Sequence, residues 1–156
     1  MITKIWNICG RIAFWLSWPL LAMYLNDSSR TRILVTCGEE VLLVRSWLGN
    51  GQWGLPGGGM HRSEQPEQGA IRELLEETGI HAQTQDLKFL FAKDSTYDKG
   101  PNFKVYAYHL VLPTKPKLTK QKFEISHLMW INIAELSMNA NTDEEVRSLI
   151  EASHLT

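Results

Sequence analysis

The sequence has few cysteines and almost no net charge. Its 156 residues include two cysteines, Cys9 and Cys37, which are too few and too distant for a disulfide framework or a zinc site. A reducing compartment suits such a chain, and we expect it in the cytoplasm. With 16 lysines and arginines against 17 aspartates and glutamates, the net charge is −1. This excludes the strongly basic surface typical of proteins that bind nucleic-acid polymers, so any nucleotide partner is expected to be a small molecule.

A long uninterrupted apolar run is also missing. A membrane span needs about 20 predominantly apolar residues. Residues 5–25 reach that length only by including Asn7, Gly10, Arg11, Ser17 and Pro19. Their apolar side chains share one helical face, which favours an amphipathic helix that packs on its own domain or lies at a membrane surface. A true span is the second alternative and a cleaved signal peptide the third. We expect residues 1–29 to form this apolar helical appendage and residues 30–156 to form the domain.

The rest of the chain alternates between strand and helix patterns. Strands are predicted by runs of β-favouring residues at 32–36, 40–45, 87–93, 103–112 and 128–133. A helix is expected to begin at Pro66 and end at Gly79, since proline suits a first helical turn and glycine a left-handed stop. Thr142 and Glu145 have the spacing of a capping box, which predicts a last helix toward Ala152. This order predicts an α/β sandwich around a mixed sheet.

Three carboxylates on the first of these helices carry the chemical information. Glu73, Glu76 and Glu77 are spaced at i, i+3 and i+4 and therefore share one arc of the helix, roughly opposite Leu74. Such close carboxylates repel one another and raise each other's pKa. A hard cation such as Mg²⁺ prefers oxygen ligands and relieves this repulsion. The spacing therefore indicates a metal platform.

The surrounding residues decide against a simply solvated acidic face. Glutamate-rich helix faces are usually only solvated, and glycine runs are usually turns. Here a glycine loop at residues 57–59 precedes the carboxylates, and Gly79 follows them in register. Because Gly58 has no side chain, its backbone can approach an anion or offer its carbonyl to a metal. Arg72 lies beside the arc and Glu64 precedes the helix, so we expect an Arg72–Glu64 pair that supports the loop.

Residues 58–80 resemble the complete signature of the Nudix hydrolase family (MutT type), G-x5-E-x7-R-E-U-x-E-E-x-G-U with U aliphatic, without a departure. The resemblance covers residues 30–156 and implies a Nudix-type α/β/α sandwich that hydrolyses a nucleoside diphosphate linked to another moiety. It also implies that Glu73, Glu76 and Glu77 bind Mg²⁺ or Mn²⁺, together with the Gly58 carbonyl. Either Glu73 or the downstream Glu124 would then be the base for the attacking water.

The sequence says less about the substrate. Nucleoside triphosphates, ordinary or oxidised, are the first expectation. Tyr97 follows Ile80 by seventeen residues, a placement similar to that in dinucleoside polyphosphate hydrolases of the family, which makes these substrates an alternative. A nucleotide-sensing domain without hydrolysis is a further alternative, although it would be expected to lose the carboxylates. Arg45 is a candidate phosphate contact. Phe103 is a candidate for base stacking, as are Trp47 and Tyr106, although a core or sheet-surface position is the first expectation for all three.

Overall fold

A computed structural model describes residues 28–47, 51–95, 103–120, 124–138 and 141–154. The expected N-terminal helix, except for its last two residues, lies outside these ranges, as does Tyr97. Among the described helices, none combines the length and apolar character needed to cross a membrane. The first strand begins at Ser28, two residues before Arg30, where we expect the domain to begin.

Five strands form one mixed sheet in the order β3-β4-β1-β2-β5. Strand β1 runs parallel to β4, whereas the β1–β2, β2–β5 and β3–β4 pairs are antiparallel. The strands are β1 (Ser28–Cys37), β2 (Glu40–Ser46), β3 (Lys88–Ser95), β4 (Phe103–Val111) and β5 (Ile125–Asn132). The predicted strands are confirmed, with ends that shift by up to four residues.

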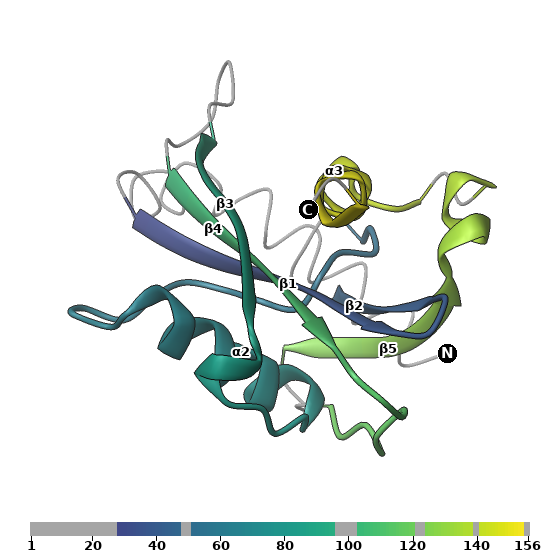
Figure 1. The fold of residues 1–156 in the computed structure, drawn as a ribbon, viewed down its shortest axis with the longest axis horizontal. Helices are drawn as coiled ribbons and strands as arrows, with labels where there is room; N and C mark the ends of the chain where they lie inside the picture. Colours follow the sequence, from purple (N-terminus) through teal and green to yellow (C-terminus); the bar gives the residue numbers. More distant parts are fainter. Residues whose placement is uncertain (1–27, 48–50, 96–102, 121–123, 139–140, 155–156) are drawn as a thin grey trace.

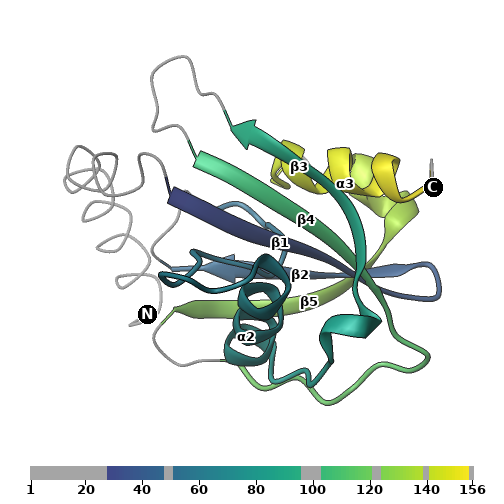
Figure 2. The ribbon, with the colours of Figure 1, turned by 60° about the vertical axis from the view of Figure 1, so that its left-hand side comes forward.

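Two helices cover opposite faces of this sheet (Figures 1 and 2). These are α2 (Pro66–Thr78) and α3 (Glu144–His154). Short 3-10 turns follow α2 and β5, as η1 (Thr84–Asp86) and η2 (Ile133–Met138). Ile33 packs with Leu74 on the α2 side, whereas its neighbour Leu34 packs with Leu149 on the α3 side. Because consecutive strand residues point to opposite faces, a central strand buried on both faces needs an unbroken apolar run.

Helix α2 has the predicted ends. Pro66 is its first residue, and Gly79 stops it in the left-handed conformation at φ 74°, with its N–H bonded to the Leu75 carbonyl at 2.8 Å. The predicted capping box of α3 is wrong, because the Asp143 carboxylate, not the Thr142 hydroxyl, accepts the N–H of Glu145 at 3.1 Å. Glu145 does not turn back to the cap, since its own carboxylate pairs with an arginine of β1.

The glycine-rich segment at residues 54–60 is held by the strands. Strands β1 and β2 pair only near their turn, at Thr36↔Val41 and Cys37↔Glu40. Beyond that point the segment hydrogen-bonds first to β2, through Gly54 and Val44, and then along β1. The Pro56 and Gly58 carbonyls accept the N–H groups of Ile33 and Thr31, both at 2.9 Å. This backbone pairing fixes the loop next to the carboxylates of α2.

Candidate active site

Two of the three expected metal ligands are buried against the glycine loop. Glu73 and Glu77 are 9% and 8% exposed, while the Glu76 side chain is 42% exposed. The Gly57 N–H donates to Oε2 of Glu77 at 2.9 Å. A Cβ added at Gly58 would lie 2.6 Å from Oε2 of Glu73, so only glycine leaves room for this carboxylate. The loop and the helix therefore fit together through residues of the acidic motif.

Arg72 organises the outer edge of the acidic cluster. Its Nε and Nη2 donate to the two carboxylate oxygens of Glu64 at 2.9 and 3.0 Å, and Nη2 also bonds the Gly59 carbonyl at 2.9 Å. Through Nη1 it contacts Glu73 at 2.8 Å and Glu76 at 3.2 Å. The side-chain bond from Arg72 lowers the pKa of Glu64 to about 2. Arg72 thus ties the loop to the helix and partly neutralises two of the three carboxylates.

Glu77 forms no comparable ion pair with a cation in the described part of the chain. Burial raises its pKa to about 8, with a further rise from Glu73 and Glu124, against the Gly57 N–H and Arg32, which lower it. A buried acid of this kind ionises readily only when a positive charge arrives. A divalent cation with oxygen ligands meets that requirement, so the donor chemistry fits a hard metal ion.

The carboxylates do not form a closed metal cage. Among the described residues, no three acidic, histidine or cysteine side chains converge closely enough to hold an ion. Arg72 accounts for part of this, because it occupies oxygens of Glu73 and Glu76. A metal would have to compete with Arg72 for them. The Gly58 carbonyl accepts the Thr31 N–H, and its second lone pair remains for an ion.

Similarity to known proteins identifies the family of this chain. The sequence profile of the NUDIX domain matches residues 28–152. The chain belongs to the NUDIX family. Members generally require a divalent metal ion. A human relative, diphosphoinositol polyphosphate phosphohydrolase 3-alpha, is 35% identical over 74 residues, which cover 47% of this chain and 43% of the relative. The match thus spans less than half of this curated relative.

Solved Nudix structures share the fold at low sequence identity. A MutT NUDIX hydrolase from Burkholderia pseudomallei is 20% identical with a TM-score of 0.71, covering 81% of this chain and 98% of that protein. The NUDIX domain of Shewanella oneidensis NrtR, solved with ADP ribose, is 20% identical with a TM-score of 0.70, covering 83% and 89%. The predicted α/β sandwich around a mixed sheet is therefore the Nudix fold.

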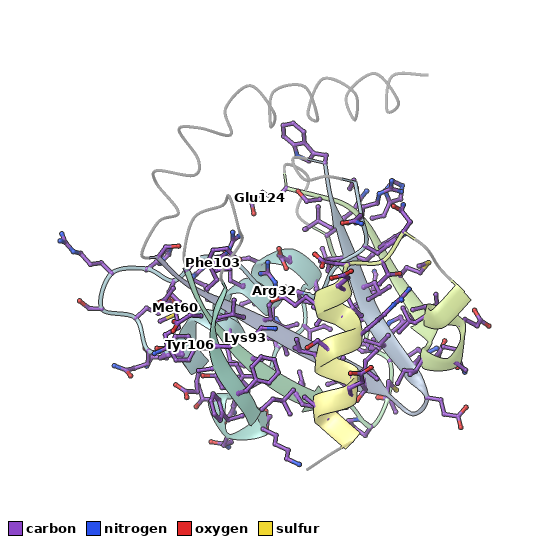
Figure 3. The ribbon with its side chains drawn as sticks, turned by 90° about the horizontal axis from the view of Figure 1, so that it is seen from above. Arg32, Met60, Lys93, Phe103, Tyr106 and Glu124 are labelled. Atoms are coloured by element: carbon purple, nitrogen blue, oxygen red, sulfur yellow. The ribbon has the colours of Figure 1, made fainter. Side chains whose placement is uncertain are left out.

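The α3 side of this Nudix domain contains a pocket that sequence reasoning missed. It has a volume of about 580 Å³ and lies between α3, β1, β3 and β4. Arg32, Lys93 and Phe103 line it from the three strands, and all three are labelled in Figure 3. Phe103 was a stacking candidate in the sequence and lines the pocket, whereas Tyr106 packs against the core on the α2 side. The remaining lining residues come from α3 and its cap, 40 or more positions away in sequence.

Arg30 is the second feature that the sequence did not reveal. Its guanidinium lies over the Phe103 ring at 5.7 Å, and its buried Nε has no hydrogen-bond partner among the described residues. Burial and the neighbouring Arg32 lower its pKa to about 10, while Glu145, Glu73 and Glu77 act in the opposite direction. Arg30 therefore contacts a residue of the pocket and also interacts electrostatically with the carboxylates. A strand pattern with arginines two residues apart was the only available signal.

The other predicted site residues lie farther from the Nudix carboxylates. Glu124 is exposed just before β5, and its carbonyl accepts the Ser46 hydroxyl at 3.1 Å. Its carboxylate is near enough to Glu77 to raise that group's pKa. Arg45 stacks over the Trp53 ring at 5.8 Å, with no ion pair to a carboxylate in the described part of the chain. The backbone N–H of Trp47 donates to the Glu124 carbonyl at 3.3 Å.

Proposed function

We propose that this protein hydrolyses a pyrophosphate bond in a nucleoside diphosphate linked to another moiety, with Mg²⁺ as its metal and Mn²⁺ as a substitute. One observation supports this most strongly. Glu73 and Glu77 are buried against a glycine loop whose N–H and missing Cβ fit them, within a complete Nudix motif. Burying two carboxylates is costly unless a cation compensates them, so the arrangement favours a metal site.

The roles that we assign follow from the contacts of each side chain. Glu73, Glu76, Glu77 and the Gly58 carbonyl would hold the metal, which when bound neutralises phosphate oxygens and activates water. Arg30 is a desolvated cation without an ion-pair partner in the described residues, and it would bind a phosphate oxygen of the diphosphate.

The base for the attacking water is Glu124 in this proposal. The Glu124 carboxylate is exposed and acts electrostatically on Glu77, which supports a role next to the expected metal. Glu73, the other candidate, already binds Arg72 through Oε1 at 2.8 Å. A carboxylate oxygen that already accepts a hydrogen bond from a guanidinium is less available to a water molecule. This favours Glu124 over Glu73.

Nucleoside triphosphates, ordinary or oxidised, remain the first substrates to test. Diphosphoinositol polyphosphates and ADP ribose join them because of the relative and the structural neighbour. The dinucleoside polyphosphate alternative depends on Tyr97, which lies outside the described residues. The sensing alternative is disfavoured by the retained carboxylates, since a domain that only binds its ligand has no need of them.

Phosphate release with this panel of substrates, with Mg²⁺ or Mn²⁺ present, tests the proposal. We expect Glu76→Gln to lower the rate by at least about 100-fold, since it removes a metal ligand and its charge. The protein should remain folded, because Glu76 is partly exposed. Glu39→Gln removes the same charge at an exposed turn and is the matched control.

The panel also separates the enzyme from the sensor. A wild-type protein that binds nucleotides in calorimetry but releases no phosphate from any substrate would contradict the proposal and favour the sensing domain. Equal rates for wild type and Glu76→Gln would show that hydrolysis does not use this acidic cluster.

A further inference from the structure

We propose that the ion pair between Arg32 and Glu145 selects the group attached to the diphosphate, so that the pocket accepts a nucleoside and rejects a group carrying several phosphates. This inference rests on the proposed hydrolysis and names the substrate class of that site. It distinguishes this chain from the diphosphoinositol polyphosphate phosphohydrolase to which its sequence is similar.

The position of the pocket makes it the place for the moiety attached to the diphosphate. Arg32 lines the pocket, and the Glu77 carboxylate is near enough to favour its charged form. Arg30 extends this connection, because it lies over Phe103 of the pocket and also interacts electrostatically with Glu73 and Glu77. A diphosphate held at the carboxylates would therefore direct its attached group toward the pocket.

The charges of the pocket disfavour a polyanion. Asp143, Glu144 and Glu145 line it from the start of α3, and Glu151 lines it from two turns farther along. Three cationic side chains, Arg32, Lys93 and Arg147, line the pocket as well. The lining thus carries one net negative charge when all groups are ionised. An attached group with several phosphates would be repelled here, whereas base amines and ribose hydroxyls can donate to the carboxylates.

Glu145 pairs with the charge of Arg32 and occupies part of its guanidinium, so Arg32 attracts a phosphate less strongly than an unpaired arginine would. Its Nε donates to Oε2 of Glu145 at 2.9 Å, and Nη1 donates to the Thr31 carbonyl at 3.1 Å. The two side chains are only 20% and 23% exposed, so solvent screens the pair weakly. Although burial lowers the pKa of Arg32, the interaction with Glu145 outweighs this effect and raises it. Glu145 is free for this pairing because Asp143 caps the helix.

An aromatic ring in the pocket lining favours a nucleobase. Phe103 supplies this ring, and the Arg30 guanidinium lies over it at 5.7 Å. Nucleobases stack on aromatic rings and on guanidinium planes, whereas an inositol ring has no flat face. Stacking and charge therefore both favour a nucleoside over an inositol polyphosphate.

Relative kcat/KM for ATP and for a diphosphoinositol pentakisphosphate tests this selectivity. We expect the wild-type protein to prefer ATP, and Glu145→Gln to shift the ratio toward the inositol substrate by about tenfold or more, because it frees Arg32 to bind phosphate. Glu151→Gln is the matched control: it removes one carboxylate from the same helix and pocket but leaves the Arg32 pair intact. In this variant the ratio of the two kcat/KM values should shift by at most about threefold.

The double variant Arg32→Gln/Glu145→Gln distinguishes a role of the ion pair in substrate selectivity from a role in anchoring α3. It loses the ion pair but has the same net pocket charge as the wild type, so the preference for ATP should return. If the pair only anchors the helix, the double variant will lower both activities as much as Glu145→Gln does, which would overturn the proposal. A wild-type protein that prefers the inositol substrate would overturn it as well.

A binding measurement keeps this inference distinct from the proposed hydrolysis. In calorimetry with inositol hexakisphosphate, Glu145→Gln should bind about tenfold more tightly than wild type, even if neither protein turns over any substrate. Equal affinities in folded proteins, as judged by circular dichroism, would contradict the selectivity. Absence of phosphate release with the expected affinity change would contradict only the hydrolysis.

Discussion

The side chain of Glu77 shows how a single residue links folding to metal binding. Its carboxylate is 8% exposed, and its partner within hydrogen-bond distance is the Gly57 N–H. Burial is the main reason that its pKa rises to about 8, from an ordinary value of 4.5. Without metal, the folded protein therefore keeps a proton on this group that the unfolded chain releases. Metal binding should expel that proton.

The raised pKa predicts how stability depends on pH. Between pH 4.5 and about 8 the folded state binds more protons at Glu77 than the unfolded state, so the free energy of unfolding should fall as pH rises through this window. One group contributes a slope of at most about 1.4 kcal/mol per pH unit. Urea unfolding in EDTA at pH 5, 6, 7 and 8 measures this dependence of the free energy of unfolding on pH.

Glu77→Gln isolates this contribution from those of other groups. The variant cannot titrate at this position, so its free energy of unfolding should fall less steeply with pH than that of the wild type. Parallel pH profiles for the two proteins would show that the carboxyl has no raised pKa. Saturating Mg²⁺ should also flatten the wild-type profile, because a bound metal favours the ionised form.

At the scale of elements, the glycine segment and helix α2 act as one unit. The segment has no regular structure of its own, but its hydrogen bonds to β1 place Gly57 and Gly58 on the carboxylates. Gly57 adopts φ 138°, and a Cβ there would lie 2.2 Å from the Thr31 carbonyl oxygen. Two adjacent glycines thus serve two purposes, close contact with a strand and close contact with a carboxylate.

Gly58→Ala should therefore damage the site more than the fold. The added Cβ would meet the Glu73 carboxylate at 2.6 Å, so this side chain must move away from its position. We expect activity to fall by at least about 100-fold, with a loss of about 1–2 kcal/mol in the free energy of unfolding. Steady-state rates and urea unfolding measure the two effects.

Gly59→Ala is the neighbouring control. No atom lies within 4 Å of a Cβ added at Gly59, and its φ is not positive. It should keep activity within about threefold of wild type. If both alanine variants lose activity equally, the loop tolerates no side chain for a reason other than the contact with Glu73.

The start of α3 shows where a local sequence rule fails. Thr142 and Glu145 have capping-box spacing, but the Thr142 hydroxyl is buried without a hydrogen-bond partner among the described residues. Asp143 takes over the cap, and Glu145 forms its ion pair with Arg32. A buried arginine attracts a carboxylate more strongly than an N-cap amide does, because the pair involves two full charges. Local spacing could not reveal this competitor.

For the whole molecule, β1 connects the two faces of the sheet. The residues on its two faces have different roles. Ile33 packs toward α2, whereas Arg30 and Arg32 lie on the side of the pocket and α3. The site thus combines carboxylates from one helix with cations from a strand and a pocket wall from the other helix. Only the stacking of layers brings these groups together (Figure 2).

The role of residues 1–26 is a prediction at this scale. Their apolar helical face favours docking on the domain or contact with a membrane surface. We expect removal of these residues to leave hydrolysis unchanged and, if they contact membranes, to move the protein from the membrane fraction to the supernatant. Fractionation of both forms with vesicle sedimentation tests this. The membrane hypothesis fails if both forms stay in the supernatant as monomers.

By itself, the sequence determined the helix that bears the carboxylates, its two ends, the glycine loop before it and the five strands. These features depend on residues close in sequence, where helical and strand periodicities fix which side chains share a face. Tertiary structure decided the rest. It placed Arg72 on Glu73 and Glu76, left Nε of Arg30 without a hydrogen-bond partner among the described residues, and paired Arg32 with Glu145, 113 positions away. Such pairs depend on how layers pack, and each charge takes the best partner that packing brings within reach.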